Sequence, residues 1–585
     1  MNFKDFNLDK KDSIFLIIIA IYTLLTLSIR VNTHMTGGLH SPDVSVYLMN
    51  ALSYAQMDYY HIADSANLYY SPLICMLTAV LFKIGIEFKL SILLVTAGFC
   101  FVGPFGLYIL LKNKFSRLLS LTGVILYGSF SIVVVNLSGG YIDVPAVSMG
   151  IWIMVFLILA VNKNPKYFLI LAPLFILGFF TRYTVGFTLP VIVLYYLINR
   201  NFMSLVENLL YDRKAFKEKL VNYLHTEEFR YIVISIGIAL IIFVIICSII
   251  MMYGGSLSFI GQSQDSLHTD KFTNKTANYV PNTIFYFKHF RYIMFNINIP
   301  FNGAFAYFAY LLVLAGVAVK TVNAIRNLSF IKSLRKNKIS FDNPKFELLL
   351  KIILVLSAVG FFVGFRMMKN NMVANILLFV IFFILFSLFE KYGINKKRQA
   401  LNLLFISWFA FYMVFITLYP IKVYRYALPL LPPFVYFVMW GLDCVLDALS
   451  NGFDDEASFK ERIKEFRINE HSKMAKVIPI VFMVLLMVMA VSYILPLETG
   501  DFSNDLVDAT DYIMEHDSDY HSKLVIAPYR FSSISQWYLQ TNVTPVTAKE
   551  IGSMNATYLI TDQSINETNY RLTEKFGVIN LYTHV

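Results

Sequence analysis

Long hydrophobic runs with almost no charge recur along most of the chain, and short clusters of charged residues separate them. Clear examples are residues 13–29, 231–252, 349–365 and 477–495. Runs of about 18 apolar residues are long enough to cross the hydrocarbon core of a bilayer as helices. The runs are continuous and do not alternate, which favours helices over a β-barrel, whose strands alternate lipid-facing and interior residues.

The pattern predicts an all-α polytopic membrane protein with about 13 transmembrane helices. Besides the four runs above, the spans we expect are 89–111, 118–136, 144–161, 167–180, 187–198, 301–319, 372–389, 401–418 and 427–446. The stretch 71–85 is short, begins with Ser-Pro and contains Lys83. We interpret it as an interfacial or partly inserted helix, because counting it as a crossing would invert every later loop.

The basic residues set the expected orientation. Lys4, Lys10 and Lys11 precede the first span, so the N-terminus should be cytoplasmic. With 13 crossings, the C-terminus lies outside, and most of the 49 Lys and Arg residues fall in the proposed cytoplasmic loops. The expected location is the cell membrane, as a multi-pass protein.

Residues 497–585 have a different pattern and predict a small extracytoplasmic α/β domain after a membrane domain of residues 1–496. Residues 504–516 have a helical period, and 524–527, 558–561 and 578–582 resemble short buried strands. Asn542, Asn555 and Asn566 begin glycosylation sequons, which permit modification outside the cell.

Composition agrees with this architecture. Of the 585 residues, 57% are hydrophobic and 15% are charged, against about 25% charged in soluble proteins. The net charge of +11 does not indicate nucleic-acid binding, because the basic residues cluster between apolar runs. The four cysteines lie in apolar stretches and predict no disulfide framework.

Histidines provide no clear metal site. His34, His40 and His61 occur in or near the first outer loop, but their irregular spacing is more typical of ordinary loop residues. No cofactor is demanded, and a divalent metal stays an open alternative.

The first outer loop contains carboxylates without cations: Asp43, Asp58 and Asp64 lie between Arg30 and Ser71. Ser41-Pro42-Asp43 favours a helix start, since Ser caps, Pro takes the first position and Asp interacts with the helix dipole. The following apolar positions form one face, which predicts an amphipathic helix along the membrane: Val44, Tyr47, Leu48, Ala51, Leu52 and Ala55.

A second acid, Asp143, stands at the outer mouth of a span. Isolated cations stand at the outer ends of three other hairpins: Arg182, Arg366, Lys369, Lys422 and Arg425. A base beside positive groups suits activation of a hydroxyl and stabilisation of a phosphate leaving group. Taken singly, each acid is equally explained as a helix-start charge, and each cation is more simply a side chain that reaches the lipid headgroups.

Four segments together resemble the GT-C superfamily of polytopic glycosyltransferases, which includes protein O-mannosyltransferases and aminoarabinose-to-lipid-A transferases. Ser-Pro-Asp-Val-Ser-Val-Tyr at 41–47 is similar to the family's first-loop Asp motif, although Val44 replaces the usual Glu. Residues 70–85 resemble its Pro-Leu segment, 141–145 its Thr-Asp element, and Arg-Tyr-Ala-Leu-Pro-Leu-Leu-Pro at 425–432 its late Arg-Tyr element.

The resemblance implies an enzyme that transfers a sugar from a polyprenyl-phosphate donor to a protein, glycan or lipid acceptor on the outer face. It implies Asp43 as the acceptor-side catalytic residue, with Asp143 nearby and the outer cations as donor-phosphate ligands. A transporter or flippase of lipid-linked sugars is the main alternative, and an assembly subunit is another. A transporter of this kind would need midplane charges and an internal repeat, and the sequence has neither.

Overall fold

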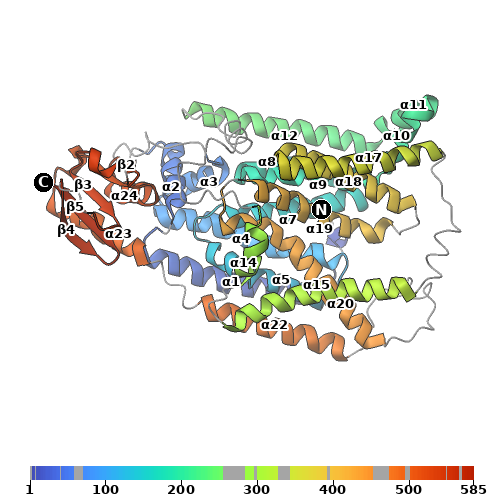
Figure 1. Ribbon diagram of the computed structural model, residues 1–585, viewed down its shortest axis with the longest axis horizontal. Coiled ribbons are helices and arrows are strands. Elements are labelled where there is room, and N and C mark those ends of the chain that lie inside the picture. Colours follow the sequence, from blue (N-terminus) through green and yellow to red (C-terminus); the bar gives the residue numbers. More distant parts are fainter. Residues whose placement is uncertain are drawn as a thin grey trace.

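The protein is a bundle of long helices with a small sheet domain at one end, as seen in the computed structural model (Figure 1). The structure describes residues 3–6, 8–39, 41–57, 70–253, 283–295, 300–326, 343–391, 396–419, 421–451, 473–494, 501–548, 550–565 and 569–585. His40, His61, Asp58, Asp64 and Asn566 lie outside these ranges.

Within the described ranges, nine helices are long and apolar enough to cross a membrane, or up to ten if one bent pair counts as a span. They come from α1 (Asp12–Thr36), α4 (Phe88–Lys112), α7 (Asp143–Asn162), α12 (Glu227–Met252), α15 (Pro300–Arg326), α17 (Pro344–Phe362) with η6 (Val363–Met367), α18 (Asn371–Lys391), α19 (Lys396–Leu418), and η7 (Tyr424–Leu430) with α20 (Leu431–Asn451). The protein is therefore a multi-pass membrane protein.

The other four predicted spans are also helical, but they are shorter or broken. They are α5 (Arg117–Gly128) with α6 (Ser131–Asn136), η3 (Pro165–Tyr167) with α8 (Phe168–Thr181), η4 (Tyr183–Thr188) with α9 (Leu189–Asn199), and α22 (Lys473–Ile494). The predicted count of 13 crossings stays a prediction, because the apolar stretches of these four, including residues 477–491 in α22, are too short or too bent to be assigned by length alone.

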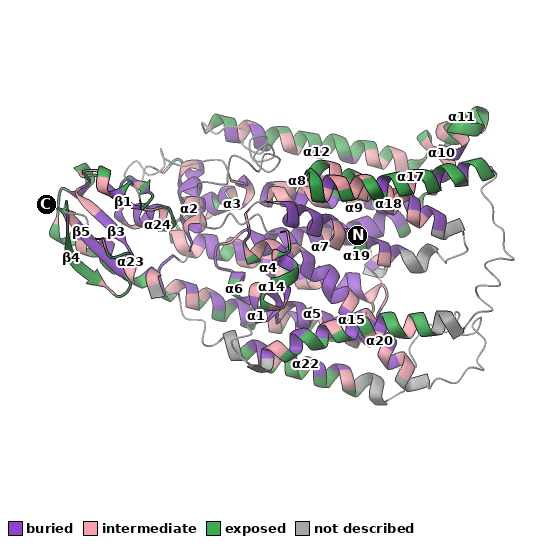
Figure 2. Cartoon of the chain, in the orientation of Figure 1, coloured by how far each residue is buried: buried purple, intermediate pink, exposed green. Residues whose placement is uncertain are grey.

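Burial separates the centre of the bundle from its rim. Helix α7 is buried along nearly all of its length, whereas α12 and α17 expose long apolar faces (Figure 2). Exposed apolar side chains such as Leu240, Ile241 and Leu356 suit contact with lipid tails. The start of α7 is therefore an enclosed place in the bundle, and it holds the buried acid Asp143.

Shorter helices complete the described bundle. They are η1 (Phe3–Phe6), α2 (Pro42–Ala55), α3 (Pro72–Lys83), α10 (Phe202–Tyr211), α11 (Arg213–Leu224) and α14 (Phe285–Met294). Helix α3 has 12 residues, about 18 Å at 1.5 Å per residue, so it is too short to cross the hydrocarbon core. This agrees with the interfacial or partly inserted helix predicted for residues 71–85.

Helix α2 differs from its prediction in one respect. All six predicted apolar positions are buried, but no residue of α2 is exposed. Both α3 and the C-terminal domain pack on α2, and Ser533 of that domain donates a hydrogen bond to the Pro42 carbonyl. The sequence pattern could not show this cover, because the covering residues lie almost 500 positions further along the chain.

The C-terminal domain is a five-stranded sheet with helices packed on it. Its elements are α23 (Asp501–His516), η8 (Tyr520–Ser522), β1 (Val525–Pro528), α24 (Tyr529–Leu539), β2 (Val543–Val546), η9 (Ile551–Ser553), β3 (Tyr558–Thr561), β4 (Tyr570–Phe576) and β5 (Ile579–His584). The strand order is β2-β1-β3-β5-β4. Strand β1 is parallel to β2 and β3, while β5 is antiparallel to β3 and β4. The proposed domain boundary at residue 497 falls between α22 and α23.

Candidate active site

The site begins with the first residues of α2. The Ser41 side chain accepts a hydrogen bond from the Asp43 backbone N–H at 3.2 Å, so the predicted cap forms. This cap fixes the start of the helix, and the Asp43 carboxylate leaves the first turn towards Arg425. Arg425 Nη2 donates to Asp43 Oδ2, and both side chains are about one-fifth to one-quarter exposed.

A second ion pair is more buried than the first. Asp143 is the first residue of α7, and Arg182 directly follows the last residue of α8. The two helices pack against each other. Arg182 forms an ion pair with Asp143, whose side chain is only 4% exposed. The Nε atom of Arg425 is 3.8 Å from Asp143 Oδ2, so Arg425 lies close to both carboxylates.

The four charged side chains of the site balance one another. Two carboxylates face two guanidinium groups, so the cluster carries no net charge in this state. The Nε–H of Arg425 is buried and has no hydrogen-bond acceptor among the described residues. A buried N–H without an acceptor costs about 1–3 kcal/mol, and an anionic ligand oxygen would remove that cost.

Tyrosines enclose the two arginines. The Arg182 guanidinium lies 5.1 Å from the centre of the Tyr426 ring, and that of Arg425 lies 5.3 Å from the Tyr141 ring. Burial raises the pKa of Tyr47 well above its ordinary value, and the neighbouring Asp43 carboxylate raises it further. Burial also raises the pKa of Tyr141. Both phenols therefore stay neutral and add no negative charge beside the two arginines.

A glycine turn brings α7 against the start of α2. Gly140 has φ +80°, and a Cβ there would stand 2.7 Å from Val44 Cγ1. A side chain at this position is therefore excluded both by the backbone conformation and by the contact. This turn precedes Asp143 by three residues and allows the second acid to approach the first.

Lys422 has a different place from that of the arginines. It is buried, and its ammonium donates to the carbonyls of Ile416, Thr417 and Tyr419 at 2.9, 2.7 and 2.5 Å. An ammonium group has three donors, so none is left for a phosphate in this arrangement. Lys422 satisfies the last carbonyls of α19 and fixes the segment that carries Arg425.

Arg366 and Lys369 form no ion pair with the four-residue cluster among the described residues. Both are exposed around the turn between η6 and α18, and neither forms an ion pair with a residue in the described ranges. Lys369 has φ 49°, a left-handed conformation that is uncommon outside glycine. The structure thus joins four of the predicted site residues and leaves these two at a separate turn.

Sequence reasoning missed two kinds of information about this site. It did not predict which acid pairs with which arginine, because that depends on how distant hairpins pack. It also did not predict the contacts of Tyr286 in α14, whose hydroxyl donates to the Val423 carbonyl at 3.0 Å and whose ring faces Lys422. The amphipathic pattern of residues 284–294 could have indicated a helix packed on this segment.

The described part of the chain contains no cluster of three or more His, Cys, Asp or Glu residues suited to a metal ion. His34 lies instead beside Arg30, whose Nη2 is 2.9 Å from His34 Nε2. The two carboxylates and two guanidinium groups that the structure brings together suit acid–base and electrostatic chemistry.

Comparisons with known proteins agree with the expected fold. A sequence model of the dolichyl-phosphate-mannose-protein mannosyltransferase family matches residues 70–211. The crystal structure of ArnT from Cupriavidus metallidurans bound to undecaprenyl phosphate is similar, with a TM-score of 0.53 and 11% identity, covering 97% of this chain and 98% of that chain. The apo state gives 0.50 and 10%, covering 96% and 98%. No curated protein sequence matches the chain.

Proposed function

Since the chain has the fold of the GT-C glycosyltransferases, as its motifs predicted, we propose that it transfers a sugar from a polyprenyl-phosphate donor to an acceptor. The sugar is a mannose-like hexose or a pentose. The acceptor is a protein, a glycan or a lipid on the outer face of the cell membrane. In this orientation the N-terminus is cytoplasmic, and the C-terminal domain is extracytoplasmic.

One observation carries the proposal: the partly exposed Asp43–Arg425 pair lies beside the buried Asp143–Arg182 pair, and Arg425 is close to both acids. A glycosyl transfer needs a base for the acceptor hydroxyl and a cation for the departing phosphate. Asp43 and Arg425 are of the required types, they touch, and both are accessible. The undecaprenyl phosphate bound to ArnT supports the class of donor.

The pairing suggests how the donor prepares the base. With Arg425 bound to Asp43, a guanidinium donor occupies one oxygen of the carboxylate. A donor phosphate that takes the Nε–H and Nη2–H of Arg425 releases Asp43. The base then becomes available only when a leaving group is present, which limits wasteful hydrolysis.

The transfer step follows from these positions. The acceptor oxygen attacks the anomeric carbon opposite the phosphate, and its proton passes to Asp43. The bond between the anomeric carbon and the phosphate oxygen breaks, and polyprenyl phosphate leaves with the electron pair. The configuration inverts, because one displacement occurs.

The buried pair supports the reacting pair. Arg182 stabilises charge on the phosphate, and Asp143 orients both arginines through contacts with each. A preorganised donor of this kind contributes about 3–4 kcal/mol to catalysis in other enzymes. Arg366, Lys369 and Lys422 are further candidate cations from the sequence; among these, the geometry of Lys422 favours a supporting role.

Product analysis tests the proposal. Purified protein in detergent is given a panel of radiolabelled polyprenyl-phosphate sugars with peptide, glycan and lipid acceptors. We expect release of polyprenyl phosphate and an inverted glycosidic product for one member. Movement of intact lipid-linked sugar across liposomes, without cleavage of the sugar–phosphate bond, would instead establish the flippase alternative.

A further inference from the structure

The backbone just before Asp43 is bound by the C-terminal domain. The Gly38 N–H donates to the Asn504 side-chain oxygen at 3.0 Å, and the Leu39 N–H donates to the Tyr538 hydroxyl at 2.7 Å. Ser533 donates to the Pro42 carbonyl at 3.2 Å. Three hydrogen bonds thus connect residues 38–42 to α23 and α24 across more than 460 positions of sequence.

The same segment is in close steric contact with that domain. A Cβ added at Gly38 would stand 2.4 Å from the Ser503 backbone oxygen, so only glycine fits there. Leu39 and Leu48 belong to one buried apolar cluster with Ile534 and Trp537 of α24. The contact is therefore a packed interface that fixes the distance between the two parts.

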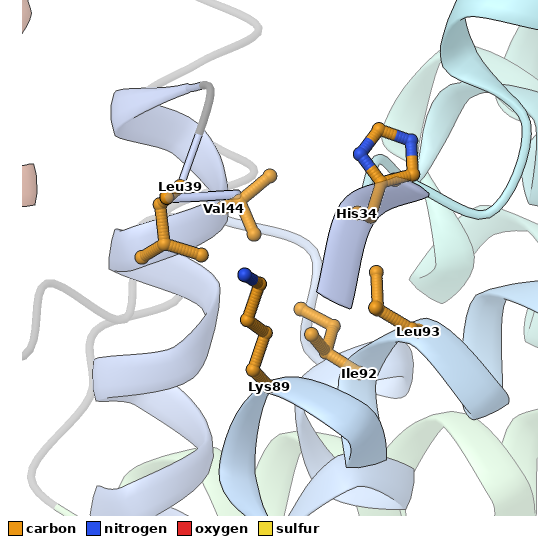
Figure 3. Close-up of a pocket in the computed structure, with 8 residues that line it drawn as sticks. His34, Leu39, Val44, Lys89, Ile92 and Leu93 are labelled. Carbon is orange, nitrogen blue, oxygen red and sulfur yellow. The ribbon is translucent and has the colours of Figure 1, made fainter. Parts of the chain in front are cut away.

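The segment also faces α4 of the membrane bundle. A cavity about the size of one water molecule lies there, with Leu39, Val44, Ile92 and Leu93 in its lining (Figure 3). Lys89 extends into the same space from α4, and its ammonium donates to the carbonyls of Met35 and Gly37 at the end of α1. Lys89 thus secures the end of α1, while the hydrogen bonds to the Gly38 and Leu39 amides come from the C-terminal domain. The Pro42 carbonyl accepts from Ser533 of that domain and also from Ser45 of α2.

We propose that the C-terminal domain positions the catalytic aspartate, with Tyr538 as the main positioning residue. Tyr538 holds the backbone four residues before Asp43, so it positions the Ser41-capped start of α2 and the carboxylate that meets Arg425. Arg425 is fixed independently, because Lys422 anchors its segment to α19. This inference rests on the proposed function, in which Asp43 is the base.

The direct test is Tyr538→Phe, which removes one hydroxyl and keeps the ring. The matched control is Tyr529→Phe on the same helix, whose side chain is exposed and whose hydroxyl has no hydrogen-bond partner among the described residues. We expect kcat to fall about tenfold in Tyr538→Phe, the scale of one lost hydrogen bond, while the donor KM stays unchanged. Equal kcat in both variants would overturn the inference.

Hydrogen exchange gives a second readout that does not depend on transfer. The amides of Gly38 and Leu39 should exchange faster in Tyr538→Phe, while those of α4 and the sheet stay unchanged. Unchanged exchange of residues 36–41 would overturn the positioning role, even if the wild-type protein showed no transfer at all. If wild-type protein transfers no sugar but the exchange effect appears, the proposed function fails and the structural link stands.

A double variant separates positioning from general loss of folding. If Tyr538 acts through Asp43, adding Tyr538→Phe to Asp43→Asn should cause no further loss of the residual transfer rate. A general structural defect would lower both backgrounds by the same factor. That second result would overturn the inference.

Discussion

At the scale of single residues, Arg425 is the side chain that contacts both acids of the site. Arg425→Lys keeps the charge but loses the planar set of donors that can bind two phosphate oxygens. We expect kcat/KM for the donor to fall about 10²–10³-fold, the scale of a lost oxyanion donor. Steady-state kinetics measure it, with the exposed Arg530→Lys as control. Wild-type values for Arg425→Lys would contradict the phosphate role.

The buried acid should behave differently from the accessible one. Asp143→Asn leaves Arg182 buried without its ion-pair partner, and breaking a buried pair costs about 3–5 kcal/mol. We expect a clear loss of thermal stability together with lower activity. For Asp43→Asn, whose pair is partly exposed, we expect loss of activity with a nearly unchanged melting temperature. Thermal unfolding in detergent distinguishes the two, and equal melting temperatures would contradict the assignment.

Much of the site could be anticipated from residue type and motif order. The sequence indicates four candidate site residues that the structure brings together: Asp43, Asp143, Arg182 and Arg425. Their pairing could not be chosen, because it depends on the packing of α2, α7, α8 and η7 against one another. Lys422 shows the same limit: only the structure reveals that its donors are used by α19.

At the scale of elements, the length of the apolar runs predicted most of the membrane helices, and the two missed strands have a common reason. The sequence indicated β1, β3 and β5, which form the centre of the sheet. Strand β2 contains Pro545, and β4 is largely exposed with no apolar alternation. Both are edge strands, where proline and charged residues are tolerated, so their sequences carry little strand signal.

The contacts of Asp517 near the junction of α23 and β3 predict that the stability of this domain depends on pH. Lys523 and the Tyr558 hydroxyl bond the Asp517 carboxylate at 2.6 Å, and these bonds, that of Lys523 first, lower the pKa of Asp517. A carboxylate with a lowered folded-state pKa adds stability above its unfolded pKa of about 3.9. That stability is lost as the pH falls through the folded-state pKa. Unfolding curves of Asp517→Asn should lack this acid-dependent part, and an unchanged pH dependence would contradict it.

At the scale of the whole molecule, the crossing count decides which face carries the site. Thirteen crossings place the two termini on opposite sides of the membrane, with the C-terminal domain and Asp43 outside. Single cysteines replacing the exposed Asp508 and Lys10 test this in intact cells, because the four native cysteines are buried. We expect an impermeant thiol reagent to label position 508 and not position 10. Labelling of both or neither would contradict an odd number of crossings.

The proposed transfer mechanism depends most directly on Asp43, the base that Arg425 binds until a donor phosphate is present. Single-turnover transfer from the preferred polyprenyl-phosphate sugar should be compared in the wild-type protein, Asp43→Asn and the exposed control Asp508→Asn. We expect Asp43→Asn to transfer about 10²–10⁴-fold more slowly while it still binds the donor, and Asp508→Asn to match the wild type. Full transfer by Asp43→Asn would contradict the account.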